Sequence, residues 1–339
     1  MKSMTDKEKQ QNYLDTAKFF LLTLRYAIFE DKKMPKKPDN VRWEDLFILS
    51  QRHSVIPIVF QYIMKIKDEI EPNLFLKWKN ENDLYVFVDT EQNFAWDEIK
   101  NYFSQKEIPI LPVKGILLKS IYPQTYLRTM GDLDILFKRE FREKIHESLS
   151  ELGYKYDGSH SDTTVDFYHR PTNSNIEAHY SLMPKSAPFK DYYVDIWEKA
   201  LATETPFLYR LSREDEYLFL LIHAAKHFFS GGTGVRTIVD LYLFNKKYHD
   251  ALDREYIKKE LEKVSEIAKK SGPQEYSLIE FEKIVKKLMD QWFNNEIILD
   301  NTGLKIITDG VYGRSENLWV KRLKEMGRKR YLLYRLFPP

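Results

Sequence analysis

The chain has 339 residues, of which 43% are apolar and 14% aromatic, proportions typical of a globular protein and unlike those of a disordered one. Lys and Arg total 53 against 51 for Asp and Glu, so the net charge of +2 gives no general argument for binding nucleic acid or an acidic membrane. Cysteine is absent, which excludes disulfides and cysteine-ligated zinc or iron–sulfur sites and fits a cytoplasmic location.

The first hundred residues carry mostly helical patterns. The most apolar early segment, residues 19–29, is interrupted by Arg25 and is too short to span a bilayer, so no transmembrane segment is expected. His53 is interpreted as a capping or core-edge histidine. Apolar residues at three- and four-residue spacing, or compact apolar runs, predict helices over residues 12–29, 43–49, 53–60 and 84–103.

The pattern changes after residue 105. Residues 108–113 form a short β-rich run whose prolines suit an edge strand, and Lys114 and Gly115 follow it. Apolar periodicity then resumes over residues 116–121, so we expect a strand, a glycine turn and a helix that begins at the turn. A helix N-terminus offers free N–H groups to phosphate, although many such turns have no chemical role.

Two carboxylates, Asp132 and Asp134, lie one residue apart in an otherwise apolar run that follows Gly131. On a strand they project to the same face while Leu133 points to the core. Neighbouring carboxylates repel each other, and Mg²⁺ or Mn²⁺ relieves that repulsion because these ions prefer oxygen ligands. The alternative is an exposed turn or an ion pair with Arg128.

More strands are predicted downstream, and they place a third carboxylate near this pair. Glu177 and His179 share one face of the strand predicted over residues 175–182. Neighbouring strands that carry Asp132, Asp134 and Glu177 would form the kind of site that two-metal phosphoryl or nucleotidyl transfer needs. His179 is interpreted as a residue that holds a carboxylate. The other strands are predicted over residues 154–156 and 165–169, after a helix over 139–152 that ends at Gly153.

Helical patterns return after residue 206. A capped start at Ser212 leads into a helix that carries His223 and His227 at i and i+4. Zinc is possible at this spacing, but no glutamate accompanies the histidines, and the favoured interpretation is a polar wall with Lys226 and Arg236 available for phosphate. Further helices are predicted over residues 235–248 and, as a pair, within 251–299.

The sequence therefore predicts an α+β fold in three parts. These are an N-terminal helical region (1–100), a small mixed-sheet α/β core (101–205) and a C-terminal helical domain (206–339). The basic tail over residues 321–335 has interleaved tyrosines and leucines, and it could bind RNA or an anionic membrane. The favoured interpretation is a solvated helix whose apolar side packs on the domain.

Taken together, these motifs resemble the bacterial uncharacterised nucleotidyltransferase family of the DNA polymerase β-like nucleotidyltransferase superfamily. The resemblance covers most of the chain, and the linked set is fairly specific, whereas the Asp-x-Asp alone is not. It rests on Val113-Lys114-Gly115, Tyr122, Arg128, Gly131-Asp132-Leu133-Asp134-Ile135, Ile176-Glu177-Ala178-His179, His223-Ala224-Ala225-Lys226-His227, Gly234-Val235-Arg236, Asp240 and the region from Trp43 to Pro57.

The resemblance implies a Mg²⁺-dependent enzyme (or one that uses Mn²⁺) that moves a nucleoside monophosphate from an NTP, ATP included, to an unidentified acceptor hydroxyl and releases pyrophosphate. Asp132, Asp134 and Glu177 would be the catalytic metal ligands, with Glu177 as ligand or as base. The residues expected to bind the nucleotide and support the metal are Lys114, Gly115, Arg128, Gly131, His179, Lys226, His227 and Arg236.

The sequence also departs from the superfamily pattern. Ile116 stands where the superfamily has a serine after the glycine, and Gly115 lies farther from Asp132 than is usual, so Lys114 or Arg128 would take over triphosphate contacts. Family members run on past a segment like the one ending at Pro339, so the natural chain is expected to continue.

Two other functions stay open from the sequence. The chain could be a catalytically inactive module that senses a nucleotide, or an RNA- or tRNA-directed nucleotidyltransferase toxin that uses the basic tail. Nucleic acid is a possible partner that the net charge does not indicate. The sequence fixes neither the acceptor nor the oligomeric state.

Overall fold

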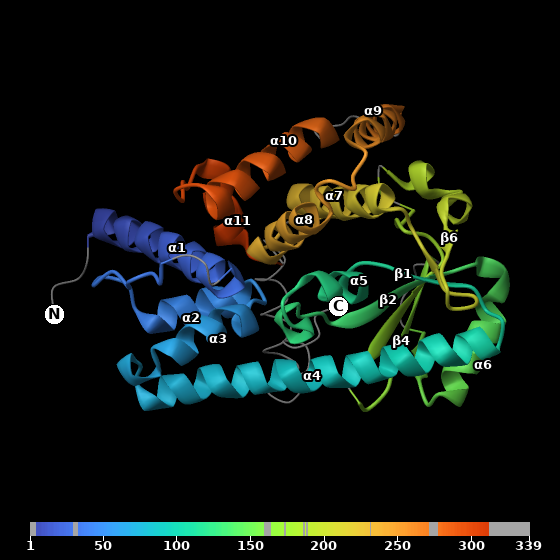
Figure 1. Cartoon of the computed structure of the whole chain (residues 1–339), viewed down its shortest axis with the longest axis horizontal. Helices are drawn as coiled ribbons and strands as arrows, with labels where there is room; N and C mark the ends of the chain where they lie inside the picture. The colour runs from blue at the N-terminus through green and yellow to red at the C-terminus, as the bar shows by residue number, and fades with distance from the viewer. Residues whose placement is uncertain are drawn as a thin grey trace.

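A mixed five-stranded sheet lies between helices on both of its faces, with a separate group of N-terminal helices at one end (Figure 1). This computed structural model describes residues 5–29, 33–158, 164–172, 174–185, 187, 189–230, 232–270 and 277–311. The predicted α+β class is confirmed. The basic tail over residues 321–335 lies outside the described residues. None of the described helices contains a stretch long and apolar enough to cross a membrane.

Four helices make up the N-terminal part, and the last of them is the longest element of the described chain. They are α1 (Asp6–Phe29), α2 (Trp43–Arg52), α3 (Ile56–Lys65) and α4 (Pro72–Gln105). α4 begins at Pro72, a residue suited to the first helical turn, and the side chain of Glu71 accepts a hydrogen bond from the Leu74 amide at 2.9 Å. α4 then continues under the sheet (Figure 1), past the domain boundary predicted at residue 100. The division of the chain at residues 100 and 205 stays a prediction.

The sheet has the strand order β1-β2-β5-β4-β3. Only β2 and β5 are parallel; the other pairings are antiparallel. β1 is an edge strand, which is where a strand tolerates a proline such as Pro112. The strands are β1 (Ile110–Pro112), β2 (Asp132–Phe137), β3 (Lys155–Asp157), β4 (Val165–His169) and β5 (Asn175–His179), with a separate pair formed by β6 (Leu201–Ala202) and β7 (Tyr209–Arg210).

One face of the sheet packs on α4 and on α6 (Arg142–Glu151). Alternate residues of β2 and β5 point into this core, among them Leu133, Ile135 and Ile176. They meet the last turns of α4, where the rings of Phe103 and of Phe137 in β2 lie 5.4 Å apart between centroids. Because these residues fill one face, the intervening residues of both strands face the opposite way, toward the C-terminal helices.

The C-terminal helices form a layer across the other side of the sheet (Figure 1). α7 starts as predicted, with the Ser212 hydroxyl accepting a hydrogen bond from the Asp215 amide at 3.1 Å. The helices are α7 (Arg213–Ser230), α8 (Val235–Tyr248), α9 (Arg254–Lys270), α10 (Leu278–Met289) and α11 (Asn301–Asp309), with a π-helical turn over Asp290–Asn294. The short elements are α5 (Gly115–Leu118) and 3₁₀ turns over Lys67–Glu69, Lys119–Ile121, Thr125–Leu127, Arg139–Phe141, Lys190–Tyr193 and Ile196–Lys199.

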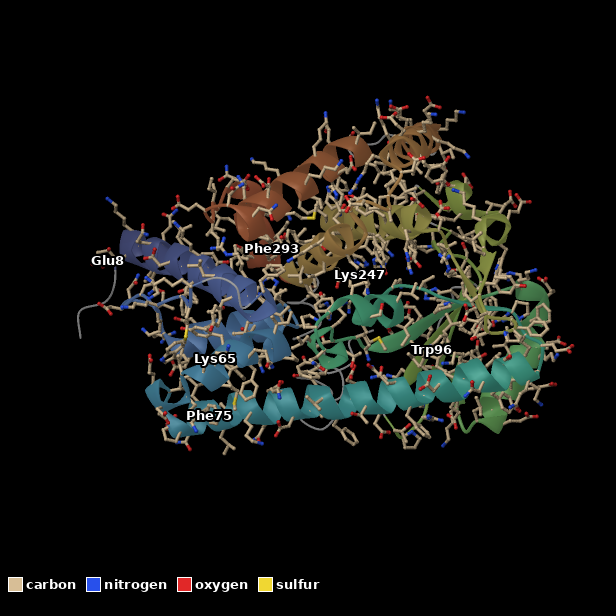
Figure 2. The ribbon with its side chains drawn as sticks, viewed as in Figure 1. Glu8, Lys65, Phe75, Trp96, Lys247 and Phe293 are labelled. Carbon is tan, nitrogen blue, oxygen red and sulfur yellow. The ribbon has the colours of Figure 1, made fainter. Side chains whose placement is uncertain are left out.

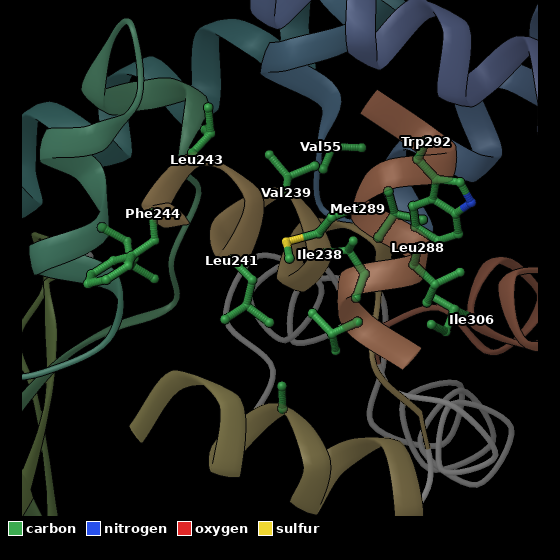
Figure 3. Close-up of a cluster of buried hydrophobic side chains, with 14 of the residues drawn as sticks. Val55, Ile238, Val239, Leu241, Leu243, Phe244, Leu288, Met289, Trp292 and Ile306 are labelled. Carbon is green, nitrogen blue, oxygen red and sulfur yellow. The ribbon is translucent and has the colours of Figure 1, made fainter. Parts of the chain in front are cut away.

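α8 joins the C-terminal layer to the rest of the chain. Figure 3 shows its buried residues Ile238 and Val239 in one cluster with Val55 of the N-terminal part and Trp292 near the end of α10. Lys247, labelled in Figure 2, lies on the side of α8 toward α5, and its ammonium donates to the carbonyl of Ser120 at 2.9 Å. These contacts therefore fix the positions of the sheet, the N-terminal helices and α8 relative to one another.

His53 is a buried link within this assembly. Its Nδ1 accepts a hydrogen bond from the Val235 amide at the start of α8 at 3.1 Å, and its Nε2 lies 3.1 Å from the carbonyl of Ile307 in α11. This arrangement requires the neutral imidazole with the proton on Nε2. Burial lowers the pKa of His53 to about 3, so the ring stays neutral at ordinary pH. Of the capping or core-edge roles expected for His53, the structure shows capping, because the ring is fully buried and accepts from the first amide of α8.

Candidate functional site

The pairing of β2 with β5 brings the predicted carboxylates together. In this parallel register Asp134 lies directly opposite Glu177, and Asp132 lies opposite Asn175. All three acidic side chains belong to the face of the sheet that turns away from α4. We call Asp132, Asp134 and Glu177 the acid cluster. Asp134 is 6% exposed, so its charge requires nearby compensation.

Lys114 supplies much of that compensation. Its ammonium lies 2.5 Å from Oδ1 of Asp134, and the two side chains are 20% and 7% exposed. The backbone of Lys114 has φ 55° and ψ −121°, a conformation that L-residues rarely adopt and that places it at the turn after β1. Strained residues of this kind persist where the surrounding structure fixes them, and they concentrate at functional sites.

Gly115 follows Lys114 and is required by packing. A Cβ atom at this position would lie 2.9 Å from the sulfur of Met130 and 3.1 Å from its Cβ, closer than side chains normally approach. Gly115 thus lets the turn after β1 lie against the segment that leads into β2. Gly131, also predicted to belong to the site, directly precedes β2 and is half-buried.

His179 bridges two members of the acid cluster. Its Nε2 lies 2.8 Å from Oδ1 of Asp134 and 3.2 Å from Oε2 of Glu177. The hydrogen bonds to these carboxylates raise its pKa, although burial and the charge of Lys114 act in the opposite direction. One potential ligand atom from each of Asp134, Glu177 and His179 lies within 4.8 Å of the others, and this is the metal-compatible group that the described residues contain.

The pKa values of Asp132 and Glu177 are shifted in opposite directions. Burial raises the pKa of Asp132 well above its ordinary value, and the negative charges of Glu177 and Asp134 raise it further. Burial acts on Glu177 in the same direction, but hydrogen bonding by His179 and the charge of Lys114 outweigh it and lower its pKa. The surroundings thus favour the protonated form of Asp132 and the ionised form of Glu177.

This distribution of charge fits a divalent cation. Lys114 and the hydrogen bonds of His179 offset part of the negative charge of the acid cluster, and a bound cation would favour the ionised form of its carboxylates. Carboxylate oxygens suit Mg²⁺ and Mn²⁺, while an imidazole ligand suits the transition metals. Asp134, Glu177 and His179 have the required geometry, and Asp132 is beside them on β2.

Three basic residues of α7 face this region: His223, Lys226 and His227. We call them the α7 wall. Burial lowers the pKa of all three, and the charge of Lys114 lowers each further. The carboxylates of Glu177 and Asp134 act on Lys226 in the opposite sense, which places its ammonium within electrostatic reach of the acid cluster.

The two histidines of the α7 wall lie against each other. Nε2 of His227 is 3.2 Å from Nε2 of His223, and burial lowers the pKa of His227 to about 4. The metal-compatible group among the described residues includes neither ring. The polar wall that the sequence favoured over a zinc pair is consistent with this arrangement.

The two predicted arginines have partners that join α8 to the segment before β2. Nε of Arg128 donates to Asp240 at 2.7 Å, and the hydroxyl of Tyr122 donates to the same oxygen at 2.7 Å. Arg236 donates to the carbonyl and to the hydroxyl oxygen of Thr129, each at 2.8 Å. Arg128 thus pairs with Asp240, and Lys114 is the residue that pairs with Asp134.

The sequence predicts Lys114 at the phosphate end of the site but does not predict its contact with Asp134. No local signal indicates this contact, because a lysine at positive φ has no sequence signature. Sequence reasoning also missed Glu216, a buried acid in the first turn of α7. Acidic residues are common in the first turn of a helix because they interact favourably with the helix dipole. A buried acid at this position therefore cannot be recognised from the sequence.

Comparison with known proteins gives one decisive match. The sequence model of a family described as uncharacterised nucleotidyltransferase matches residues 39–265, most of the chain. The chain belongs to this family, as its motifs predicted, and it is therefore a nucleotidyltransferase. No curated protein matches the chain significantly.

Two solved structures of the antibiotic-resistance factor ANT(2″)-Ia resemble the chain at a distance. The solution structure has 13% identity and a TM-score of 0.37, and the match covers 50% of this chain and 89% of that protein. The crystal structure, a complex with adenylyl-2″-tobramycin, has 12% identity and a TM-score of 0.35, with coverage of 52% and 95%. TM-scores below 0.5 do not establish a shared fold, so the family assignment rests on the sequence match.

Proposed function

We propose that the chain transfers a nucleoside monophosphate from an NTP to an acceptor hydroxyl at the acid cluster, with Mg²⁺ or Mn²⁺ bound there. The acceptor hydroxyl oxygen bonds to the α-phosphorus and gives up its proton to solvent, the bond from that phosphorus to the bridging oxygen breaks, and pyrophosphate leaves. The observation that carries the proposal is the register of Asp134 against Glu177, with His179 joining the two carboxylates.

The metal would be held by Asp134 and Glu177, with Asp132 beside them as a further ligand and His179 as a fourth ligand or as the residue that holds the carboxylates. A divalent cation there would offset negative charge on the transferred phosphate. The lowered pKa of Glu177 favours the role of ligand over that of general base, because a weakly basic carboxylate is a poor proton acceptor.

The positive groups around the cluster suit the triphosphate. Lys114 pairs with Asp134 in this structure, and its ammonium would be available to phosphate oxygens where a cation held that carboxylate. Lys226 faces the same region from α7. The superfamily's glycine–serine turn is replaced here by Lys114-Gly115-Ile116, so we assign the triphosphate contacts to these two lysines, with Arg128, Arg236 and His227 as the surrounding positive or polar groups.

A transfer assay tests the proposal. The protein is incubated with each labelled NTP in turn, with Mg²⁺ or Mn²⁺ and a cell extract, and mass spectrometry identifies whatever acquires a nucleotide while released pyrophosphate is measured. We expect one labelled product and an equal amount of pyrophosphate. Nucleotide binding by calorimetry without pyrophosphate release in any extract would favour a nucleotide-sensing module. A cytoplasmic location, where NTPs and Mg²⁺ are supplied, belongs to the same proposal.

A further inference from the structure

The metal-compatible group at the acid cluster contains an imidazole. It consists of one ligand atom each from Asp134, Glu177 and His179, all within 4.8 Å of one another. His179 follows Glu177 by two residues on β5, so the two side chains share one face of that strand, and Asp134 lies opposite Glu177 on β2. The donor set is therefore two carboxylates and a ring nitrogen, whereas the Asp-x-Asp pattern indicates carboxylates only.

The spacing of these atoms is that of neighbouring ligands on one ion. Nε2 of His179 lies 2.8 Å from Oδ1 of Asp134 and 3.2 Å from Oε2 of Glu177. Bonds from small divalent ions to nitrogen or oxygen are about 2.0–2.2 Å long, so two ligand atoms bonded at a right angle are about 3 Å apart. The ring nitrogen is therefore as well placed to bind a metal as the two carboxylate oxygens.

The burial and the chemistry of this group favour Mn²⁺ over Mg²⁺. The side chains are 7% exposed for Asp134, 18% for Glu177 and 13% for His179, which leaves little room for the several water molecules that Mg²⁺ usually keeps. Mg²⁺ is also bound through oxygen atoms. Mn²⁺ accepts the same carboxylates and, as a transition ion, bonds to imidazole as well. A nitrogen ligand therefore adds affinity for Mn²⁺ and little for Mg²⁺.

Lys114 adds to this preference. Its ammonium lies 2.5 Å from Oδ1 of Asp134, the oxygen that the imidazole also contacts, so any metal ion competes with it for that carboxylate. An ion that also bonds to His179 gains affinity from a contact that does not depend on displacing Lys114. We infer that His179 is a direct metal ligand and that the site therefore binds Mn²⁺ in preference to Mg²⁺. The inference rests on the proposed function only for the presence of a divalent cation at the acid cluster.

Spectroscopy of bound Mn²⁺ tests the bond directly, on the full chain and without nucleotide. Electron spin-echo spectra detect a nitrogen bonded to Mn²⁺ through its nuclear coupling, and the coupling changes when histidine is labelled with ¹⁵N. We expect this coupling in the unaltered chain and its loss in His179→Gln. A spectrum of the Mn²⁺-saturated unaltered chain without nitrogen coupling would overturn the inference, and this measurement stands even if the variant folds poorly.

Affinities measure the preference. Free Mn²⁺ is followed by its EPR signal, and Mg²⁺ is titrated in competition with it. In the unaltered chain we expect Mn²⁺ to bind at least about tenfold more tightly than Mg²⁺. Glutamine keeps an amide that can hold a carboxylate, so His179→Gln should weaken Mn²⁺ binding by about the same factor and leave Mg²⁺ binding nearly unchanged.

A different pattern of affinities would contradict the inference. If the imidazole only held the carboxylates, its loss would weaken the binding of both ions by a similar factor, up to about 100-fold. That result in a variant whose circular dichroism matches the unaltered chain, or equal affinities for the two ions in the unaltered chain, would overturn the role of His179 as a ligand.

His146→Gln is the matched control. His146 lies on α6 and contacts the rings of Tyr156 and Tyr168, and the metal-compatible group found among the described residues does not include it. Its replacement should leave both affinities unchanged. A fall in the preference for Mn²⁺ as large as that of His179→Gln would overturn the assignment to His179.

The transfer assay separates this inference from the proposed function. Nitrogen coupling and a preference for Mn²⁺ in a chain that transfers no nucleotide would support the inference and contradict the proposed function. Nucleotide transfer by a chain that binds Mg²⁺ as tightly as Mn²⁺ would contradict the inference and leave the proposed function intact.

Discussion

Replacing Lys114 by methionine removes the positive charge that lies 2.5 Å from Oδ1 of Asp134 while keeping an unbranched side chain at the strained backbone position. Both side chains are mostly buried, at 20% and 7% exposure, so solvent screens their interaction little. Removing one partner of a buried pair typically costs about 3–5 kcal/mol, because the other charge is left uncompensated. We expect Lys114→Met to lower the free energy of unfolding by an amount in that range in the absence of divalent cations.

A cation should restore this loss. At a free Mn²⁺ concentration about 100 times the dissociation constant, binding to the native state alone adds about 2.7 kcal/mol. The gain should be larger in Lys114→Met than in the unaltered chain, where the ammonium competes for Asp134. Urea unfolding with and without Mn²⁺ measures both quantities, and Lys114→Arg, which keeps the charge, should behave like the unaltered chain.

Lys119→Met is the matched control, because Lys119 forms a comparably buried pair with Asp89 at 2.6 Å. Its loss should destabilise the chain without any rescue by Mn²⁺, since the metal-compatible group among the described residues includes neither residue. Equal Mn²⁺ stabilisation of the two methionine variants would refute the reasoning. So would a Lys114→Met chain that is as stable as the unaltered one without metal.

Two further predictions concern the buried links that hold the site in place. Asp240→Asn leaves Arg128 buried without its carboxylate and should lower the free energy of unfolding in urea by about 3–5 kcal/mol. Tyr122→Phe removes one hydrogen bond to Asp240 and should lower it by about 1 kcal/mol. Similar losses for the two variants would contradict the ion-pair account. His53 has a folded pKa of about 3, below its unfolded value, so its contribution is complete above pH 6.5 and is lost as the pH falls toward 3. Between pH 7 and pH 4.5 this amounts to about 2.5 kcal/mol, which should be absent from the pH profile of His53→Gln, and identical profiles would show that the ring is not buried in its neutral form.

Much of the fold could be predicted because local patterns and tertiary packing agree. The bounds of α8, Val235–Tyr248, are those predicted, and its apolar stripe is the face that packs in the core. On β5 the alternation of Ile176 and Ala178 with Glu177 and His179 correctly assigned the two faces, because a strand in a covered sheet must bury one of them.

Other elements differ from the prediction for physical reasons. α4 starts at Pro72, twelve residues before the helix predicted from Leu84, because its first turns depend on a glutamate cap and on packing against α3. The helix expected after Gly115 ends at Leu118 and passes into a 3₁₀ turn, since Pro123 holds the preceding Tyr122 in an extended conformation. α11 was not predicted, although Asp300 caps it through the Gly303 amide at 2.8 Å.

The candidate site could likewise be predicted only in part from the sequence. Strand periodicity was sufficient to place Asp132, Asp134 and Glu177 on one face, because side-chain alternation is a local property. The contacts of Lys114 with Asp134, and of Arg128 with Asp240, depend on how distant segments pack, and no short motif records them.

The central claim is that nucleotidyl transfer takes place at the acid cluster, and Asp134→Asn tests it most directly. Asparagine keeps the size of the side chain and removes the charge that Lys114, His179 and a cation would share. Single-turnover transfer of a labelled nucleotide, measured on a variant whose circular dichroism matches the unaltered chain, should fall by at least about a thousandfold, the loss of several kcal/mol of transition-state stabilisation. Full transfer activity in a correctly folded Asp134→Asn chain would contradict the account.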